Sequence, residues 1–501
     1  MNRGRLTILT LAGLVIWSVM FGRLVWLQAV RGGHYKYLAQ KQHQQRIGIL
    51  PERGRIYDRC GRPLALSFDG RRSYPYGPMG AQLLGFIGDD GRGLEGMELL
   101  YDDLLRGQSG WAIRQRDATG RTHATLEYAS SPAKAGHSVF LTIDAEYQAI
   151  ADQELAKGAK SAKAVSGTVV ISDPGTGEIL AIASYPPFDP NCFKIYGREF
   201  YINRAVLEQF EPGSTFKIIT MAAAVEEGVI EPDDIIDGEK GSFSIGGYKI
   251  GEAENHKYGL ITASDAIAHS SNICLVKIGQ ELGKEKLYQY ARSFGFGCKT
   301  GIEFPGETEG VMDRPDKWSV IQSANISFGQ GISVNAIQLT VAYSAIANGG
   351  YLIKPRLLRG YGEKDEIIQN ASKADTLRRV ISSETAKKLV SMLEKCVEKG
   401  TGKPAAIGGW KIAGKTGTAQ KKTEGKKGYD QEKYIASFIG FIPAESPRLM
   451  VSVIINEPHG KVYGGLVAAP VCHNIMKRII SLPNGFAQDL MANNVGINTK
   501  L

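Results

Sequence analysis

The sequence predicts an α+β protein, with a mostly antiparallel sheet between helical layers, a small N-terminal pedestal and one transmembrane helix. Three observations carry this prediction. A long apolar run follows the first few residues, and residues 71–150 hold short apolar segments broken by Tyr and Gly turns. β-rich hairpin patterns, Ser166 to Ser184 and Tyr434 to Ile455, stand near the two ends of the larger remaining part. Helical patterns fill the space between them, which indicates a sheet built from both ends of one domain.

The N-terminal apolar run, residues 6–30, is long enough to cross a bilayer with some tilt. Arg3 and Arg5 precede it and place the N-terminus inside the cell. A cleavable signal peptide is the alternative, but the run exceeds a usual signal core and no small-x-small cleavage site follows it. We therefore expect an uncleaved anchor. Arg23 interrupts the run, and it either snorkels to the outer interface or faces a partner helix.

The domain order follows from changes in amino-acid composition and secondary-structure pattern along the chain. Around Asp144 the Gly- and Tyr-rich pattern gives way to a helix-and-hairpin pattern, and from about Asn484 the chain is polar. We expect a cytoplasmic N-terminus (1–5), a transmembrane anchor (6–30), a pedestal domain (31–150), a larger globular domain (151–483) and a polar tail (484–501).

Hairpins and helices of the larger domain are signalled locally. Asp173 to Gly177 is a turn between two Val- and Ile-rich strands, and Pro443 to Pro447 separates a second pair of strands. Apolar periodicity predicts helices over residues 145–159, 215–229, 262–281, 284–293, 335–347 and 383–399.

Composition excludes several classes of function. Apolar residues make up 43% and charged residues 22%, which is globular composition. The 60 basic residues outnumber the 51 acidic ones, yet they are scattered and match no nucleic-acid-binding motif, so we expect no nucleic acid partner. Six cysteines show neither CxxC nor Cys/His spacing, so no metal site is indicated.

The first chemical motif is Ser214-Thr215-Phe216-Lys217, which follows Pro212-Gly213 at the start of a predicted helix. Residues three apart lie on one helix face, so Ser214 and Lys217 are expected within hydrogen-bonding reach as a nucleophile and its base. The motif alone is weak, because Ser131-Pro132-Ala133-Lys134 matches it as well. A helix cap with an exposed lysine is the ordinary alternative.

The second motif is Ser270-Ser271-Asn272, where a hydroxyl and an amide could enter the same cleft. SxN patterns are also common. Ser323-Ala324-Asn325 and Ser333-Val334-Asn335 match, and each could be only a cap or a turn.

The third motif is Lys415-Thr416-Gly417-Thr418 on a predicted edge strand beside the nucleophile. A cation and hydroxyls suit a substrate carboxylate, and glycine permits close approach of an acyl donor. Lys299-Thr300-Gly301 matches too, but it stands close behind Ser270 and runs into a loop-like sequence, so we reject it. Together, SxxK, SxN and KTG in this order form a known set.

These motifs resemble those of class B penicillin-binding proteins, and the resemblance covers nearly the whole chain. Arg53 to Arg59 and Gly93 to Glu98 are similar to the family's pedestal motifs. Glu211-Pro212-Gly213 before the serine resembles the division and sporulation branch. The stretch between Ala65 and Gly93 is shorter than in division-type members, so the chain resembles a member with a shortened N-terminal head. The resemblance implies the penicillin-binding-protein/β-lactamase-like fold for the transpeptidase domain.

The resemblance further implies a peptidoglycan D,D-transpeptidase. A stem peptide ending in D-Ala-D-Ala would acylate Ser214, with Lys217 as base and backbone N–H groups of Ser214 and Thr418 as oxyanion hole. Ser270 would relay a proton to the leaving D-alanine, and Asn272 would hold the peptide backbone. An amine of a neighbouring stem then takes the acyl group.

By the same resemblance, Lys415, Thr416 and Thr418 would bind the donor carboxylate, with Gly417 between the threonines. The implied partners are lipid II-derived glycan strands, β-lactams as covalent inhibitors, a membrane-embedded glycan polymerase and division proteins. No cofactor is implied. The location implied is the bacterial cytoplasmic membrane, with the catalytic domain outside.

Several alternatives stay open within and beyond this family. Septal wall synthesis is the expected role, and elongation or sporulation is the alternative. A β-lactamase would need a water-activating glutamate motif, and no suitable one stands between Asn272 and Lys415. A β-lactam sensor would carry a cytoplasmic signalling region, whereas only a few residues precede the apolar run.

Overall fold

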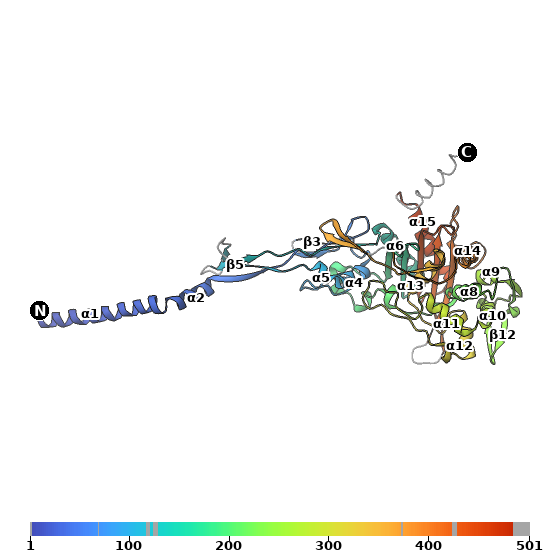
Figure 1. The fold of residues 1–501 in the computed structure, drawn as a ribbon, viewed down its shortest axis with the longest axis horizontal. Coiled ribbons are helices and arrows are strands. Elements are labelled where there is room, and N and C mark those ends of the chain that lie inside the picture. The colour runs from blue at the N-terminus through green and yellow to red at the C-terminus, as the bar shows by residue number, and fades with distance from the viewer. Residues whose placement is uncertain are drawn as a thin grey trace. The chain divides into compact units, whose positions relative to one another are not determined.

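The computed structural model describes residues 3–68, 70–116, 121–123, 129–371, 374–422 and 428–483. The chain divides into two compact units, one formed by residues 1–53 and 106–136 and the other by residues 54–105 and 137 onward (Figure 1). The predicted pedestal range, 31–150, contributes to both units, and its boundaries stay a prediction. The predicted polar tail, 484–501, lies outside the described residues.

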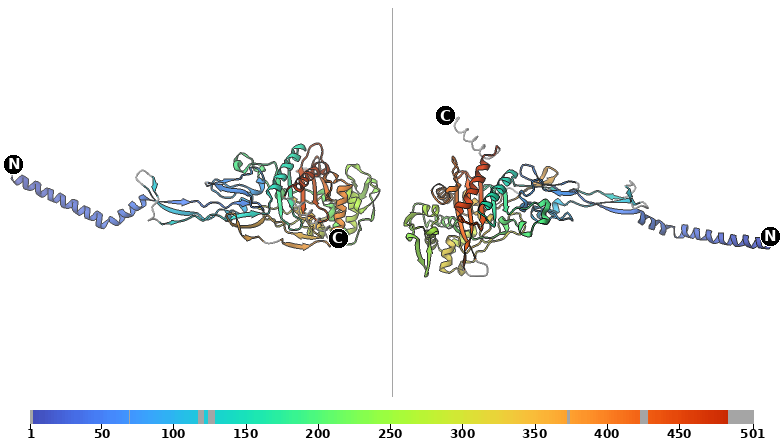
Figure 2. Two further views of the ribbon diagram at one scale, coloured as in Figure 1. Left: turned by 90° about the horizontal axis from the view of Figure 1, so that it is seen from above. Right: turned by 180° about the vertical axis from the view of Figure 1, so that it is seen from behind.

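The first unit consists of a helical run and a β ribbon (Figure 2). Helix α1 (Arg3–Val25) continues through the π-helical turn η1 (Trp26–Val30), and α2 (Gly32–His43) follows. Strand β1 (Gln44–Ile49) then pairs antiparallel with β5 (Gly110–Arg116). The 28 residues from Arg3 to Val30 are long and apolar enough to cross a membrane, which is compatible with a single-pass anchor.

Arg23 lies in the C-terminal third of this apolar run and contacts an aromatic ring. Its guanidinium carbon lies 4.9 Å from the centroid of the Trp26 ring, and that of Arg31 lies 4.5 Å from the same centroid. Both contacts are cation–π geometry. Trp26 between two cations is the arrangement expected of a helix end at a membrane–water interface, where aromatic and basic side chains gather.

The second unit is built on a five-stranded sheet in which every neighbouring pair is antiparallel. Its spatial order is β10-β9-β21-β20-β19, so the two predicted hairpins adjoin and the KTG strand lies at one edge. The strands are β9 (Ser166–Ser172), β10 (Ile179–Tyr185), β19 (Ala413–Lys422), β20 (Tyr429–Ile442) and β21 (Leu449–Asn456). The mostly antiparallel sheet predicted from the sequence is confirmed.

Helices cover both faces of this sheet (Figures 1 and 2). On one face α6 (Ala145–Ser161) and α15 (Gly464–Ile480) pack on a core that includes Val169 and Ile171. Val170, between these two residues, belongs to the core on the opposite face. That second core is formed with helices that include α8 (Lys217–Glu226) and α13 (Ala336–Ala347). Period-two alternation along β9 thus supplies both layers.

Two helices replace the single helix predicted over residues 262–281. Helix α9 (Ala263–Ala268) ends, and α10 (Asn272–Leu282) begins after a break of three residues. The break contains Ser270 at φ +63°, which no α-helix accommodates, and the prediction of one continuous helix was wrong. Helices α11 (Lys284–Ser293) and α14 (Ser383–Glu398) agree with the predicted ranges.

A six-stranded sheet in the order β17-β16-β8-β2-β3-β4 joins distant parts of the chain. Its early strands are β2 (Ile56–Tyr57), β3 (Pro63–Phe68), β4 (Arg71–Ser73) and β8 (Ser138–Leu141). The late strands are β16 (Leu358–Glu363) and β17 (Glu366–Asn370), and β16 pairs with β8. Residues from the predicted catalytic range therefore complete a sheet begun by the pedestal range.

Candidate active site

Ser214 lies in a tight turn that precedes α8. The 3-10 turn η4 (Gly213–Thr215) brings it there, and Gly213 has φ +52°, a conformation that glycine adopts without strain. The Gly213 N–H donates to the Gly329 carbonyl at 3.0 Å, which fixes the turn against a neighbouring loop. A Cβ on Gly329 would lie 2.1 Å from the Gly213 oxygen, so only glycine allows this approach. Ser214 itself stays partly exposed.

Lys217, the first residue of α8, is fully buried at 0% exposure. Its Nζ lies 2.5 Å from the Ser270 carbonyl oxygen, 3.1 Å from Ser270 Oγ and 2.7 Å from Asn272 Oδ1. Ser214 Oγ is not among the hydrogen-bond partners of Lys217 in the described part of the chain. The first and second motifs are thus joined directly through the lysine.

The pKa of Lys217 is lowered well below its usual value. Burial is the largest cause, because it penalises the charged form, and the positive charge of Lys415 is the second. The negative charge of Glu252 acts in the opposite direction, as would a thiolate at Cys274. The lowered pKa favours the neutral amine, which is the form that accepts a proton.

The second motif forms the corner between α9 and α10. Ser270 holds a left-handed φ of +63°, which is uncommon for a residue other than glycine. The side chain of Ser271 caps α10 by accepting from the Cys274 N–H at 3.2 Å. Asn272 then donates from Nδ2 to the Gly251 carbonyl at 2.9 Å, so its Oδ1 faces Lys217.

Glu252 holds this corner in place, and no sequence motif indicated this role. Its carboxylate accepts from Ser271 Oγ at 2.5 Å and from the Asn272 N–H at 2.6 Å. The side chain is only 8% exposed. A carboxylate at a helix N-terminus satisfies free N–H groups and complements the helix dipole. Nothing near Glu252 in the sequence indicates a contact with a helix that begins 20 positions later.

The third motif lies on β19, next to the nucleophile turn. Lys415 is fully buried, its Nζ donates to the Thr416 carbonyl at 3.3 Å, and burial lowers its pKa. Thr416 Oγ1 is hydrogen-bonded to Thr401 Oγ1 at 2.6 Å. Thr418 Oγ1 accepts from the Gly464 N–H at 3.0 Å. Both threonine hydroxyls are therefore held in place by other elements.

Gly417, between these threonines, marks how closely β19 approaches the nucleophile turn. A Cβ at this position would lie 2.8 Å from Thr215 Cγ2 and 3.1 Å from the Pro212 oxygen. It would also lie 2.4 Å from Ser437 Oγ on the neighbouring strand. Because β19 is the last strand of its sheet, it pairs with β20 on one side and faces the turn with the other.

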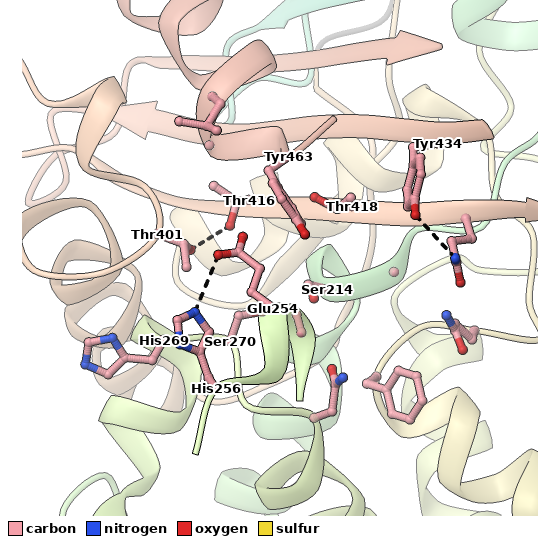
Figure 3. A pocket seen from close by; sticks show the side chains of 18 of the residues that line it. Ser214, Glu254, His256, His269, Ser270, Thr401, Thr416, Thr418, Tyr434 and Tyr463 are labelled. Atoms are coloured by element: carbon pink, nitrogen blue, oxygen red, sulfur yellow. Dashed lines mark hydrogen bonds and ion pairs between the residues drawn. The ribbon is translucent and has the colours of Figure 1, made fainter. Parts of the chain in front are cut away.

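All three motifs open onto one pocket of about 500 Å³ (Figure 3). Ser214, Ser270, Asn272, Thr416 and Thr418 line it. The buried lysines lie behind this surface rather than on it. Further side chains come from the segment before α10, from the loop after α14, from β20, and from the N-cap and first turn of α15: Glu254, His256, His269, Thr401, Tyr434, Tyr463 and Leu466.

The other matches to the motifs lie elsewhere. Ser131 belongs to the short strand β7 (Ser130–Ser131) of the first unit. Asn335 caps α13, and Ser323 to Asn325 lies inside α12 (Val320–Ser327). In the rejected Lys299-Thr300-Gly301 copy, Thr300 donates from its N–H and its hydroxyl to Glu307, both at 2.6 Å, which is a loop-holding role. None of these residues lines the pocket among the residues described.

Comparison with known proteins agrees with this geometry. Residues 167–477 match the penicillin-binding protein transpeptidase domain, and residues 67–141 match the penicillin-binding protein dimerisation domain. Stage V sporulation protein D of Bacillus subtilis is 36% identical over 459 residues, covering 88% of this chain and 70% of that protein. The "Probable peptidoglycan D,D-transpeptidase PenA" of Neisseria meningitidis is 34% identical over 413 residues, covering 81% of this chain and 68% of that protein.

Solved structures lead to the same family. Penicillin-binding protein 3 of Mycobacterium tuberculosis superimposes with a TM-score of 0.78 at 32% identity, covering 87% of this chain and 96% of that one. The same protein has been solved in complex with aztreonam and with ampicillin. Sequence, fold and pocket thus agree, and the chain belongs to the class B penicillin-binding proteins, the peptidoglycan D,D-transpeptidases.

Proposed function

We propose that this chain cross-links peptidoglycan through an acyl-enzyme on Ser214. The observation that carries the proposal is the buried Lys217 amine, which is hydrogen-bonded to Ser270 and Asn272 behind the pocket that Ser214 lines. Neutral Lys217 takes the serine proton as Oγ attacks the penultimate carbonyl of a D-Ala-D-Ala stem. Backbone N–H groups of Ser214 and Thr418 stabilise the developing oxyanion.

Departure of the terminal D-alanine requires a proton on its nitrogen. Ser270 is suited to deliver it, because its Oγ lies 3.1 Å from Lys217 Nζ and the residue also lines the pocket. Asn272 holds the donor backbone and orients Lys217. Breaking of the C–N bond then leaves the acyl group on Ser214.

The donor carboxylate binds at β19. Lys415 supplies a positive charge behind the pocket, while Thr416 and Thr418 offer hydroxyls on its surface. The donor backbone lies against the strand segment that contains Gly417, as an added edge. A β-lactam carries both the carboxylate and the reactive carbonyl, so it acylates the same serine as a slowly released inhibitor.

The arrangement in the cell follows from the anchor. Residues 6–30 span the cytoplasmic membrane, 1–5 stay inside, and the pedestal (31–150) and transpeptidase domain (151–483) lie outside. Lipid II-derived glycan strands are the substrate, and a membrane-embedded glycan polymerase and division proteins are the partners. Septal wall synthesis is the role we propose. Sporulation is the second candidate, because a sporulation protein is 36% identical to this chain.

Mapping of a penicillin adduct tests the proposal. The detergent-solubilised full chain is incubated with a penicillin, digested and analysed by peptide mass spectrometry. We expect a stable adduct on Ser214. An adduct on Ser131 or Ser270, or no adduct in a sample with a normal thermal melt, would reject the assignment. Rapid release of the adduct would indicate a β-lactamase instead.

A further inference from the structure

The rim of the active-site pocket carries a carboxylate, Glu254, that the chemistry above does not use. Glu254 lies in the 3-10 turn η6 (Ala253–Asn255), and its side chain lines the pocket together with Ser214. Figure 3 shows Glu254 and Tyr463 extending into the pocket from opposite sides. The negative charge of Glu254 contributes, after burial, to the raised pKa of Tyr463, so its field reaches across the pocket.

This carboxylate has no strong cationic partner among the described residues. Its ion-pair partner there is His256, with Nε2 at 3.6 Å from Oε2, and no lysine or arginine pairs with it. The side chain is 46% exposed. Glu254 is also the single carboxylate among the described residues that line the pocket. It is therefore free to bind a cation that arrives from solvent.

Charge is distributed unevenly across the pocket. Two buried lysines lie behind the surface of the pocket. Lys217 serves as a neutral amine, and Lys415 on β19 supplies the positive charge that suits a donor ending in a carboxylate. The second substrate of a transpeptidase is a primary amine, which is an ammonium ion at neutral pH because its pKa is near 10.4. That cation is repelled by Lys415 as it nears Ser214. A carboxylate at the rim offsets this repulsion.

We propose that Glu254 binds the ammonium group of the acceptor stem peptide and holds the amine beside the acyl-enzyme. This inference rests on the proposed function. The bound ammonium first releases one proton to water. The resulting amine attacks the ester carbonyl, the C–N bond forms and the bond to Ser214 Oγ breaks. The second proton of the amine returns to Ser214 Oγ, so one ester and one amine give one amide and a free serine hydroxyl.

The experiment compares two acceptors on the same acyl-enzyme. The solubilised full chain is acylated with an acyl-D-alanine thioester in the presence of D-alaninamide, a cationic amine, and methanol, a neutral nucleophile. The ratio of amide product to methyl ester product is measured by chromatography. In Glu254→Gln we expect this ratio to fall roughly three- to tenfold, as for loss of a partly exposed charged contact.

Glu239→Gln is the matched control, because Glu239 belongs to the same segment before α10 but pairs with Lys277 and does not line the pocket. Its product ratio should equal that of the unmodified protein. High salt should lower the ratio in the unmodified protein, since screening weakens an exposed charge contact. This measurement at high salt uses only the unmodified protein, so it tests the inference even if Glu254→Gln fails to fold.

Two results would overturn the inference while leaving the proposed function intact. One is an unchanged product ratio in Glu254→Gln together with a salt-independent ratio in the unmodified protein. The other is an equal loss of amide and methyl ester, which would mean that Glu254 does not distinguish the charged acceptor. If the unmodified protein forms neither a thioester-derived acyl-enzyme nor a penicillin adduct, the proposed function fails first.

Discussion

Replacing Glu252 with glutamine should extend acylation to lower pH. Lys217 acts as a base only when neutral, so the rate falls as pH drops below its pKa. Burial and Lys415 lower that pKa, whereas Glu252 and Cys274 raise it. Glu252→Gln removes one of the two raising influences, so the pKa of Lys217 falls further. The acid limb of the rate profile therefore moves to lower pH.

The size of the accompanying stability loss can be worked from the contacts. Glutamine can accept from the Asn272 N–H with its oxygen and donate to Ser271 Oγ with its amide nitrogen, so the corner keeps its shape. Two hydrogen bonds, now 2.6 Å and 2.5 Å long, change from charge-assisted to neutral. Charge-assisted bonds contribute about 1.5–3 kcal/mol and neutral ones about 0.5–1.5. We expect the free energy of unfolding to drop by about 2 kcal/mol, with the fold retained.

The assay is the second-order rate constant of acylation by a labelled penicillin between about pH 5 and 9, with each profile scaled to its own plateau. Lys415→Met should move the acid limb the opposite way, to higher pH, because a cation that disfavours protonated Lys217 is gone. Lys217→Arg should lose roughly 10² to 10⁴ in rate, since arginine does not release its proton. Lys415→Arg keeps the cation and should lose less. A thermal melt of each variant separates catalytic from folding effects.

Opposite shifts for Glu252→Gln and Lys415→Met are the diagnostic result. A shift to higher pH in Glu252→Gln would refute the electrostatic reasoning, even if acylation is slowed. Near-normal acylation by a folded Lys217→Arg variant would place the base elsewhere, with Ser270 acting through Lys415 as the next candidate.

Three further predictions concern the strand beside the serine, a buried acid and the membrane anchor. Gly417→Ala should lower the rate of acylation at least about tenfold, because its Cβ would lie 2.4 Å from Ser437 Oγ and would displace β19. Gly408→Ala is the control and should leave the rate unchanged, because no atom of the described residues beyond its chain neighbours lies within 4 Å of its Cβ position. Burial raises the pKa of Asp152 to about 7. Between about pH 4 and 7 the folded state therefore binds more protons than the unfolded state, and the free energy of unfolding falls as pH rises. Asp152→Asn should therefore raise the free energy of unfolding more at pH 8 than at pH 5, by on the order of 1 kcal/mol, which thermal melts at the two pH values would measure. Protease added to spheroplasts should digest the domain after the anchor, and protection of that domain would reject the topology.

Local signals explain which parts of the fold could be predicted. The Asp173 to Gly177 turn and the Val- and Ile-rich strands beside it depend on neighbours in sequence, and they appear in the structure as predicted. Helices α11 and α14 also begin and end where the periodicity indicates. The order of motifs identified the family, and all three motifs meet at one pocket.

Long-range contacts explain what the sequence could not show. The break between α9 and α10 depends on Glu252, which binds the first N–H of α10 from another segment. Similarly, the pairing of β16 with β8 joins strands more than 200 positions apart, so no domain boundary drawn along the sequence could include it. Apolar periodicity continued through the break, because buried residues on both sides of it face the same core.

The predicted contact between Ser214 and Lys217 illustrates the difference between spacing and direction. Three-residue spacing places both on one side of the turn, but Ser214 lies in a 3-10 turn and the lysine amine is directed to Ser270 and Asn272. Sequence spacing shows which residues can come close to one another. It does not show which of several nearby acceptors the Lys217 amine will bind.

That selection has a chemical consequence for Lys217. A neutral amine has two N–H groups that donate and one lone pair that accepts. In Lys217 the two N–H groups can donate to the Ser270 carbonyl and to Asn272 Oδ1. The Ser270 hydroxyl, 3.1 Å away, then donates to the lone pair. To accept the Ser214 proton, the lone pair must exchange Ser270 for Ser214, which frees the Ser270 hydroxyl toward the pocket. Activation of the nucleophile and release of the residue that protonates the leaving group would thus be one movement of a single amine.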